Sequence, residues 1–382
     1  MNLSPLESAQ PVIVYIDFKS PYAYLAIEPT RELERELDLQ FDWRPFVLDI
    51  PSYLGSARLG ESGQVLEQQR SAEQWSGVKY AYYDCRRYAK LQGLTIRGTE
   101  KIWDTHLAAA AMLWTKQFSH AATRQFIDSV YPRFWVRDLD LESESVVAGL
   151  LSDLGLDGAG FVAWAHAGGL ERNADFQSTA FAAGIYGVPT YVVDGACYFG
   201  REHLPRIYWQ LKGRWGPDPD IANPLPTTWL ATQPDYPKLP ERIVIGIDDS
   251  LDSLLAVPQL TEILQAYAGE LVWLRVSSRM PGEHSVAADD LSRSAMHQRF
   301  RRANVQADNR RYGPPGLAPK SYSGMIDNLL CDLNISISTE GPEQVLRPAM
   351  PGIVMLLDDE IFIGRQHLPL VAIKLGKKLA AH

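Results

Sequence analysis

The hydrophobic pattern predicts a strand, a helix and a second strand within the first fifty residues. Val12–Asp17 is a run of β-branched and apolar residues, which is typical of a buried strand. Ser20 and Pro21 follow, an N-cap serine and a proline at the first helical position, and they predict a helix over about residues 22–37. Phe41–Val47 returns to strand character. The segment therefore indicates a β-α-β unit with parallel strands.

A long helical region follows and leads to a second group of strands. Over about residues 57–185, aromatic and alanine residues recur mostly at three- and four-residue spacing, which predicts a helical insertion. Strands are expected at Thr190–Asp194 and Cys197–Phe199, joined by an Asp-Gly turn. A final helix is expected over Glu202–Lys212.

A proline-rich stretch separates two parts of the chain. Seven prolines lie between Pro217 and Pro240, a density that excludes a regular element and predicts a stiff linker. The expected organisation is an N-terminal tail over 1–10, a first domain over 11–213, a linker over 214–240 and a second domain over 241–382.

The second part repeats three patterns of the first in the same order. Arg242–Asp248 matches Pro11–Asp17, Asp308–Tyr312 matches Asp84–Tyr88, and Asp358–Pro369 matches Asp194–Pro205 without a gap. Three matches in one order indicate an internal duplication. The second and third patterns are 110 residues apart in the first copy and 50 in the second. The second copy therefore lacks most of the helical insertion.

Composition and charge exclude several classes of protein. The length of 382 residues suits two domains, and a net charge of −9 argues against binding to nucleic acid or to anionic membranes. No stretch has the roughly 18 apolar residues of a membrane span, and the first ten residues lack the features of a secretory signal. Cys85, Cys197 and Cys331 lie far apart, without Cys-x-x-Cys or zinc-site spacing, so a cytoplasmic protein without a metal site is expected.

Two segments resemble a known family. Asp17–Ala26 (DFKSPYAYLA) resembles the opening of 2-hydroxychromene-2-carboxylate isomerases and kappa-class glutathione transferases, which belong to the DsbA-like branch of the thioredoxin superfamily. Gly187–Asp194 (GVPTYVVD) resembles that branch's Gly-Val-Pro-Thr segment, whose proline is cis. Asp84, Arg87 and Ala89 fit a helix of the same family. With the duplication, the resemblance implies an α/β protein of two tandem thioredoxin-like domains, the second shortened and degenerate.

The resemblance also implies a glutathione site. Ser20 would lie beside the glutathione sulfur, and the backbone of Val188, before the cis Pro189, would meet the cysteinyl part. Glu202 would meet the γ-glutamyl amino group, with Arg201 and Asp104 nearby. The implied activity is a glutathione-dependent isomerase or transferase acting on a small hydrophobic or aromatic substrate. The missing Cys-x-x-Cys excludes a disulfide oxidoreductase.

The residue types alone support this chemistry for Ser20 and also support a simpler role. A helix N-terminus stabilises an anion, and a hydroxyl can donate a hydrogen bond to a thiolate. Alternatively, Ser20 only caps its helix, which contributes about 1 kcal/mol. Arg201-Glu202 and Asp104-Thr105 differ from the residues usual in the family, and these differences favour a non-catalytic binding or scaffold protein.

Further residues are assigned by pattern. Tyr22, Tyr82 and Trp103 are candidates for a substrate pocket, although aromatic residues at helical spacing are more often core. The basic run Arg293–Arg311 is interpreted as a solvated helix face. The second copy lacks Ser-Pro-Tyr, and its Pro351 lies two positions early, so it is expected to be catalytically inactive. It would act as a partner subunit does, which predicts an intramolecular pseudo-dimer or a homodimer.

Overall fold

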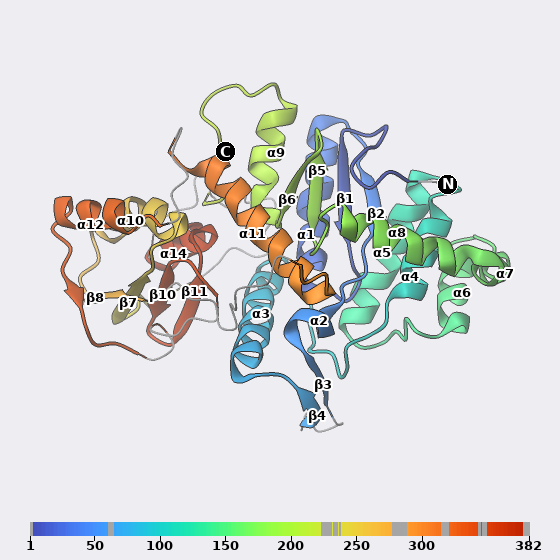
Figure 1. The fold of residues 1–382 in the computed structure, drawn as a ribbon, viewed down its shortest axis with the longest axis horizontal. Coiled ribbons are helices and arrows are strands. Elements are labelled where there is room, and N and C mark those ends of the chain that lie inside the picture. Colours follow the sequence, from blue (N-terminus) through green and yellow to red (C-terminus); the bar gives the residue numbers. More distant parts are fainter. Residues whose placement is uncertain are drawn as a thin grey trace. The chain divides into compact units, whose positions relative to one another are not determined.

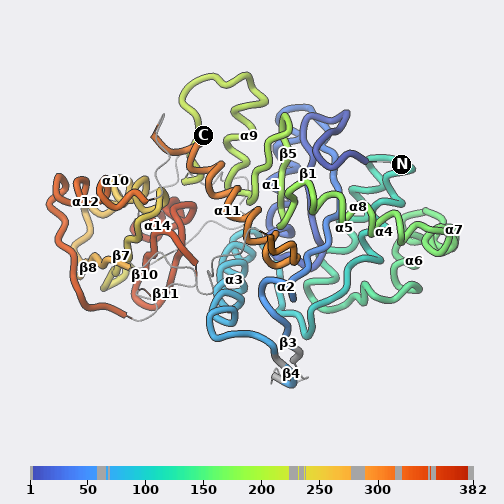
Figure 2. Tube along the Cα trace, in the orientation of Figure 1, coloured from blue at the N-terminus to red at the C-terminus, as the bar shows by residue number. Residues whose placement is uncertain are grey.

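The fold is described from a computed structural model (Figures 1 and 2), which describes residues 3–59, 65–222, 231, 236, 238–276, 289–314, 321–342, 345 and 350–376. The chain forms two compact units, each assembled from three segments. The first unit contains Met1–Ser71, Cys85–Gly216 and Ala288–Asn304. The second unit contains Ala72–Asp84, Pro217–Ala287 and Val305–His382.

A four-stranded sheet forms the centre of the first unit. Its strands are β1 (Val12–Ile16), β2 (Asp42–Pro45), β5 (Thr190–Val193) and β6 (Ala196–Phe199), in the order β2-β1-β5-β6. Helix α1 (Pro21–Leu37) connects β1 to β2, which pair in parallel, so the predicted β-α-β unit is confirmed. β5 pairs antiparallel with both β1 and β6. Every residue of β1 is buried, as its apolar sequence predicts.

The region between β2 and β5 is mostly helical. It begins with a short helix and a two-stranded hairpin that the sequence pattern did not reveal, because neither strand alternates polar and apolar residues cleanly. The elements are α2 (Ile50–Leu54), β3 (Ser56–Leu59), β4 (Val65–Gln69), α3 (Ala72–Leu91), α4 (His106–Thr115), α5 (His120–Trp135), α6 (Glu144–Asp153), α7 (Gly158–Trp164), a π-helical turn (Ala165–Gly169) and α8 (Leu170–Ala182). A 3-10 turn (Arg201–His203) and α9 (Leu204–Leu211) follow β6.

A second sheet lies in the second unit. Its strands are β7 (Arg242–Ile247), β8 (Glu270–Arg275), β9 (Ile337–Ser338), β10 (Val354–Leu357) and β11 (Glu360–Ile363), in the order β11-β10-β7-β8-β9. The helical elements that follow β7 along the chain are α10 (Leu251–Leu264), α11 (Arg293–Tyr312), α12 (Ser323–Asp332), a 3-10 turn (Arg365–His367) and α14 (Leu368–Lys374). β7 pairs in parallel with β8 and antiparallel with β10, and β10 forms a hairpin with β11.

The two sheets share their central connectivity. In each, the first strand pairs in parallel with the second and antiparallel with a strand from the C-terminal hairpin. The Gly200 amide donates to the Pro189 carbonyl (3.0 Å), and the Gly364 amide donates to the Ile353 carbonyl (2.8 Å). Ile353 therefore occupies the place that Pro189 has in the first sheet, and β9 is an additional edge strand.

The units do not follow the predicted boundaries of 11–213 and 241–382. Residues 72–84 belong to the second unit, and residues 288–304 belong to the first. Tyr80 shows the reason: it is 7% exposed within the core of the second sheet, and its hydroxyl accepts a hydrogen bond from the Ile363 amide (2.8 Å). A hydrophobic pattern shows which face of a helix is buried but not which element covers it.

The predicted N-terminal tail (1–10) and the predicted linker (214–240) have different outcomes. Part of the expected tail packs on the first sheet, because the Tyr15 hydroxyl donates to the Pro5 carbonyl (2.7 Å) and Arg44 Nη2 donates to the Glu7 carbonyl (2.8 Å). Most of the expected linker, including residues 223–230, lies outside the described residues.

Candidate functional site

Ser20 is the N-cap of α1. Its backbone is extended (φ −93°, ψ 115°), and its hydroxyl accepts a hydrogen bond from the Ala23 amide (3.2 Å). The Ser20 amide donates to the Asp17 carbonyl (2.9 Å), and the serine is 4% exposed. The first turn of α1 contains no acidic side chain, so the partial positive charge of its N-terminus is not neutralised within that turn. The predicted capping role of Ser20 is confirmed.

The Val188–Pro189 peptide bond is cis, the geometry predicted for this segment. The Ser20 hydroxyl donates to the Val188 carbonyl across a long distance of 3.4 Å, which brings together two segments 168 residues apart. The buried Val188 amide donates to no group in the described part of the chain, which is uncommon for a buried backbone N–H. At Gly187, a Cβ would lie 2.5 Å from the Phe199 ring, so only glycine fits there.

Asp17 fixes the loops around Ser20. Its buried carboxylate accepts hydrogen bonds from the Leu48 amide (2.7 Å) and the Thr105 hydroxyl (2.7 Å). Lys19, also buried, lies 3.8 Å from the same carboxylate and donates to the Trp103 carbonyl (3.1 Å). Burying this charge is tolerated because it is hydrogen-bonded and paired. Asp17 therefore ties the start of α1 to the loops after β2 and before α4.

Asp104 makes its polar contacts with neighbours other than Ser20. Its carboxylate accepts from the His106 amide (2.9 Å) and lies 2.6 Å from His106 Nδ1, while its own amide donates to Glu142 Oε1 (2.9 Å). Burial opposes ionisation, but these hydrogen bonds from His106 lower the pKa of Asp104. The neighbouring Trp103 packs edge-on against Phe134, with ring centroids 5.8 Å apart.

Arg201 and Glu202 follow the end of β6 and point to different neighbours. The Arg201 guanidinium lies 4.3 Å from the centre of the Tyr88 ring. The Glu202 carboxylate folds back over Gly200, where a Cβ would lie 2.3 Å from it. Because the Gly200 amide binds the Pro189 carbonyl, the Glu202 carboxylate lies beside the cis-proline segment.

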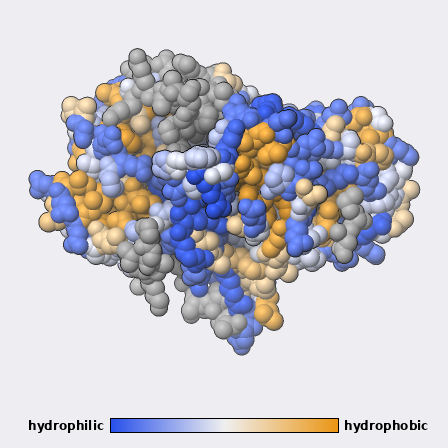
Figure 3. All heavy atoms as spheres, turned by 90° about the horizontal axis from the view of Figure 1, so that it is seen from above, coloured by the Kyte–Doolittle hydropathy of each residue, from blue (hydrophilic) through white to orange (hydrophobic). Residues whose placement is uncertain are grey.

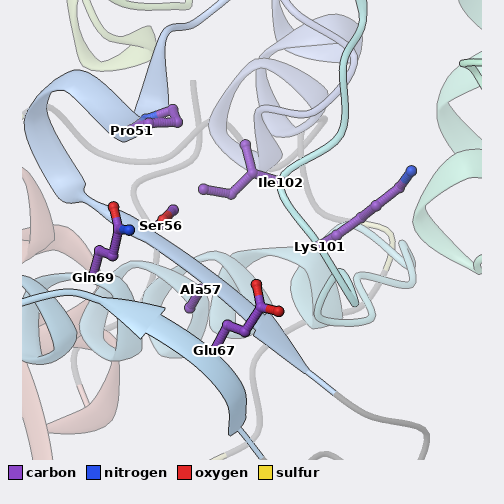
Figure 4. Close-up of a pocket in the computed structure, with 7 residues that line it drawn as sticks. All are labelled: Pro51, Ser56, Ala57, Glu67, Gln69, Lys101 and Ile102. Carbon is purple, nitrogen blue, oxygen red and sulfur yellow. The ribbon is translucent and has the colours of Figure 1, made fainter.

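A pocket of about 630 Å³ opens beside α2 and the β3-β4 hairpin (Figure 4). Ile102 points across it toward Pro51 and Ser56, whereas the Lys101 amine points away. The lining residues are Pro51, Ser56, Ala57, Glu67, Gln69, Lys101 and Ile102. The predicted lining residues Tyr22, Tyr82 and Trp103 are not among them, although Trp103 directly follows Ile102.

Tyr82 lies within the segment of α3 that belongs to the second unit, so the structure does not group it with Ser20. The aromatic character of the insertion was the only signal in the sequence that suggested Tyr82 as a pocket residue. The observed pocket has a mixed polar and apolar lining drawn partly from the unpredicted hairpin, and it left no such signal.

The described residues contain no group of three or more His, Cys, Asp or Glu side chains placed to hold a metal ion. On the face drawn in Figure 3, hydrophobic residues form separate patches among hydrophilic ones. Among the described helices, none is both long enough and apolar enough to cross a bilayer.

Comparison with known proteins identifies the first part of the chain. A family model described as a DsbA-like thioredoxin domain matches residues 11–212. A 2-hydroxychromene-2-carboxylate isomerase from Sphingobium xenophagum is 26% identical over 196 residues, which cover 50% of this chain and 92% of that protein.

Two solved structures are similar to about half of this chain. A 2-hydroxychromene-2-carboxylate isomerase structure has a TM-score of 0.42 and 18% identity, covering 53% of this chain and 94% of that one. A probable DsbA oxidoreductase from Streptomyces coelicolor has a TM-score of 0.38 and 18% identity, covering 54% of this chain and 91% of that one. The family model spans more than half of the 382 residues, and on this basis the chain belongs to the DsbA-like thioredoxin family.

Proposed function

We propose that this chain is a cytoplasmic, glutathione-dependent isomerase or transferase acting on a small hydrophobic or aromatic substrate. One observation carries the proposal: the Ser20 hydroxyl lies at the N-terminus of α1 and is directed at the Val188 carbonyl of the cis-proline segment. The similarity to a 2-hydroxychromene-2-carboxylate isomerase over 196 residues supports the same class of activity.

Ser20 would steady a sulfur anion. Its hydrogen bond to Val188 is long at 3.4 Å, so the hydroxyl proton can turn to a stronger acceptor at little cost. A hydrogen bond to a charged group contributes about 1.5–3 kcal/mol, and the amides of the first turn of α1 add their partial positive charge. Bound glutathione would supply the thiolate itself.

Backbone and carboxylate groups around Ser20 fit a tripeptide. The Val188 amide is a buried donor without an acceptor in the described part of the chain, and a peptide carbonyl would satisfy it. The Glu202 carboxylate, beside the Pro189 segment, fits an ammonium group. Arg201 stacks on Tyr88 and Asp104 binds His106, so we assign neither a direct contact.

The pocket beside the β3-β4 hairpin would receive the second substrate. Pro51, Ala57 and Ile102 give it an apolar side, and a volume of about 630 Å³ lies in the range of small-molecule sites. Its position is linked to Ser20 because Lys19 binds the carbonyl of Trp103, the residue after Ile102. This assignment replaces the lining predicted from Tyr22 and Tyr82.

We further propose that the second unit contains a degenerate thioredoxin-like copy without activity, as in an intramolecular pseudo-dimer. The shared strand pairing and the matching bonds of Gly200 and Gly364 support the duplication. The N-terminus of α10 supports the loss of activity, because Asp252 lies in its first turn and accepts a hydrogen bond from the Ile353 amide (3.0 Å). An anionic ligand there would meet a carboxylate.

Calorimetric titration with glutathione and S-hexylglutathione tests the proposed function. The wild-type chain should bind both, and Ser20→Ala should weaken glutathione binding by ten-fold or more at a pH where the bound thiol is ionised. Ser250→Ala is the matched control, because Ser250 caps α10 as Ser20 caps α1. It should leave glutathione binding unchanged. No binding at millimolar ligand would contradict the proposal.

That negative result would favour the second candidate, a non-catalytic scaffold. Two observations agree with a scaffold: Ser20 is 4% exposed, and its hydroxyl already accepts a hydrogen bond as a helix cap. Under this alternative, Ser20→Ala would lower only the free energy of unfolding, by about 1 kcal/mol.

A further inference from the structure

The first half of α11 is part of the first unit, although its sequence lies beyond the proline-rich stretch. Residues 288–304 belong to that unit, and Ala295 within them is 3% exposed. The charge pattern of Arg293–Arg311 predicts a solvated helix face, and Arg302 and Ala303 are indeed exposed, but the opposite side of this half packs on the first unit. The sequence of α11 gives no apolar pattern that would predict its contact with the first unit, because aromatic and cationic side chains form this contact. In Figure 1, α11 passes beside α2.

His297 lies at the centre of this contact. Its ring stacks on Tyr53 of α2, with centroids 4.1 Å apart and planes 6° apart, and it meets Tyr186 edge-on at 5.3 Å. Arg293, one turn earlier, pairs with Asp49 (Nε to Oδ2, 3.0 Å) and lies 4.2 Å from the centre of the Phe181 ring. Arg293 and His297 therefore anchor α11 on two segments of the first unit, 49–53 and 181–186.

These two segments flank the Ser20 site. Tyr53 follows the loop in which the Leu48 amide binds Asp17 Oδ2 (2.7 Å), and the Asp17 carbonyl in turn accepts from the Ser20 amide. Tyr186 directly precedes Gly187 and Val188, whose carbonyl accepts the Ser20 hydroxyl. His297 therefore joins the loop after β2 to the cis-proline loop. The same α2 contributes Pro51 to the pocket.

The ring nitrogens of His297 keep their hydrogen-bonding capacity. Neither nitrogen has a hydrogen-bond partner among the described residues, while the ring itself packs on Tyr53 and Tyr186. Burial, with help from Arg301 and Arg293 and against Asp49, lowers the pKa of His297 to about 4. At neutral pH the ring therefore offers one donor and one acceptor without a charge.

We propose that His297, supplied by the second half of the chain, hydrogen-bonds a polar oxygen of the second substrate from the edge of the site, between α2 and the cis-proline loop; it is not one of the residues that line the pocket itself. The inference rests on the proposed function, because it assigns a residue to that same site. Tyr53 and Tyr186 form an aromatic wall that holds the imidazole in place. Specificity for the second substrate would thus depend on a residue 277 positions after Ser20.

Two glutathione conjugates that differ in one polar group test this role. S-(4-nitrobenzyl)glutathione carries oxygen acceptors on its ring, and S-benzylglutathione does not. Wild type should bind the nitrobenzyl conjugate about five-fold more tightly by calorimetry, the effect of one neutral hydrogen bond. His297→Phe keeps the aromatic stack and should abolish this preference, with the affinity for S-benzylglutathione within two-fold of wild type. His297→Gln should restore part of it.

Arg302→Ala is the control, because it removes a positive charge from an exposed position of α11 and should leave the preference intact. A preference that survives in His297→Phe, or that wild type lacks while binding both conjugates, would overturn the role of His297 and leave the proposed function standing. If wild type binds neither conjugate, the proposed function fails and the role of His297 fails with it.

Discussion

The N-termini of α1 and α10 follow the central strand of their sheets, and both are capped by a serine, Ser20 or Ser250. The second helical position differs. In α1 it is Tyr22, and the first turn carries no carboxylate. In α10 it is Asp252, whose carboxylate binds the Ile353 amide and Arg365 Nη1 (2.8 Å). The partial positive charge at the N-terminus of α1 thus has no carboxylate in its first turn, whereas that of α10 is offset by Asp252.

Arg365 extends this difference, because it pairs with two carboxylates and its equivalent in the first unit does not, within the described part of the chain. It is 5% exposed and lies between Asp252 and Asp220, with Nη2 2.8 Å from Asp220 Oδ1. Burial works against the charge, but the two carboxylates raise the pKa of Arg365 well above its ordinary value. Its equivalent, Arg201, lies over the Tyr88 ring, as Arg365 lies over Tyr312 (5.4 Å), but no ion pair of Arg201 is found among the described residues. The arginine at this position thus belongs to a buried ion pair in the second unit and to a cation–π contact in the first.

The largest expected effect comes from removing this arginine. Arg365→Ala leaves two partly buried carboxylates without their cation and should lower the free energy of unfolding by about 3–5 kcal/mol. Arg201→Ala removes only a cation–π contact and should cost about 1 kcal/mol or less. Urea denaturation followed by circular dichroism measures both. Equal costs for the two variants would contradict the contrast drawn between the units.

A second variant tests the segment of α3 that folds with the second unit. Tyr80→Phe leaves the buried Ile363 amide without its acceptor and should cost about 1–3 kcal/mol. Hydrogen exchange at residues 360–363 should become faster. Tyr83→Phe, on the same helix but 44% exposed, is the control and should leave exchange there unchanged. Unchanged exchange in Tyr80→Phe would place this segment outside the second unit.

The contrast between the helix termini can be broken by exchanging the second helical residue. Tyr22→Asp gives α1 the carboxylate that α10 has, and this negative charge should weaken glutathione binding by ten-fold or more, about 1.4 kcal/mol. Tyr22→Asn has a similar shape to Asp without the charge and should weaken binding much less. The glutathione affinities of the two variants, measured by calorimetry, separate the effect of the charge from the effect of losing the ring. Similar losses would attribute the effect to the tyrosine ring rather than to charge.

A further prediction concerns acid stability. His297 has a pKa of about 4 in the folded chain, below the ordinary 6.5, so the unfolded chain takes up a proton first as the pH falls. Its contribution to stability is full above pH 6.5 and is lost between 6.5 and 4. Arg293, Arg301 and Asp49 set this shift. Unfolding free energies measured across this range should depend less on pH in His297→Phe; identical slopes would contradict the shift.

Local signals in the sequence predicted the elements that carry the site. The β-branched run at Val12–Asp17 and the Ser20-Pro21 start gave β1 and α1. The turn at Asp194-Gly195, where both residues adopt positive φ, was predicted because this dipeptide favours that geometry. The meeting of Ser20 with Val188 came from the family resemblance, since neither segment alone specifies its partner.

The rest depended on contacts between distant segments. Periodicity predicted a helix in the region of α3, and the charge pattern predicted one at α11. Neither signal shows that Tyr80 packs with the second sheet or that His297 stacks on Tyr53. Tyr82 is a pocket candidate only as an aromatic residue of the insertion, and its helical spacing carries no information about the unit to which it belongs. The pocket lining was missed because the β3-β4 hairpin has no clear alternation.

The placement of residues 288–304 also has a consequence for biosynthesis. The strands of the first sheet end at Phe199, but Arg293, His297 and Phe300 complete the packing of the same unit. While the ribosome translates the roughly ninety residues between them, the faces of Tyr53 and Phe181 that α11 covers remain open to water and to chaperones. The first unit to be synthesised is thus not finished until most of the chain has left the ribosome.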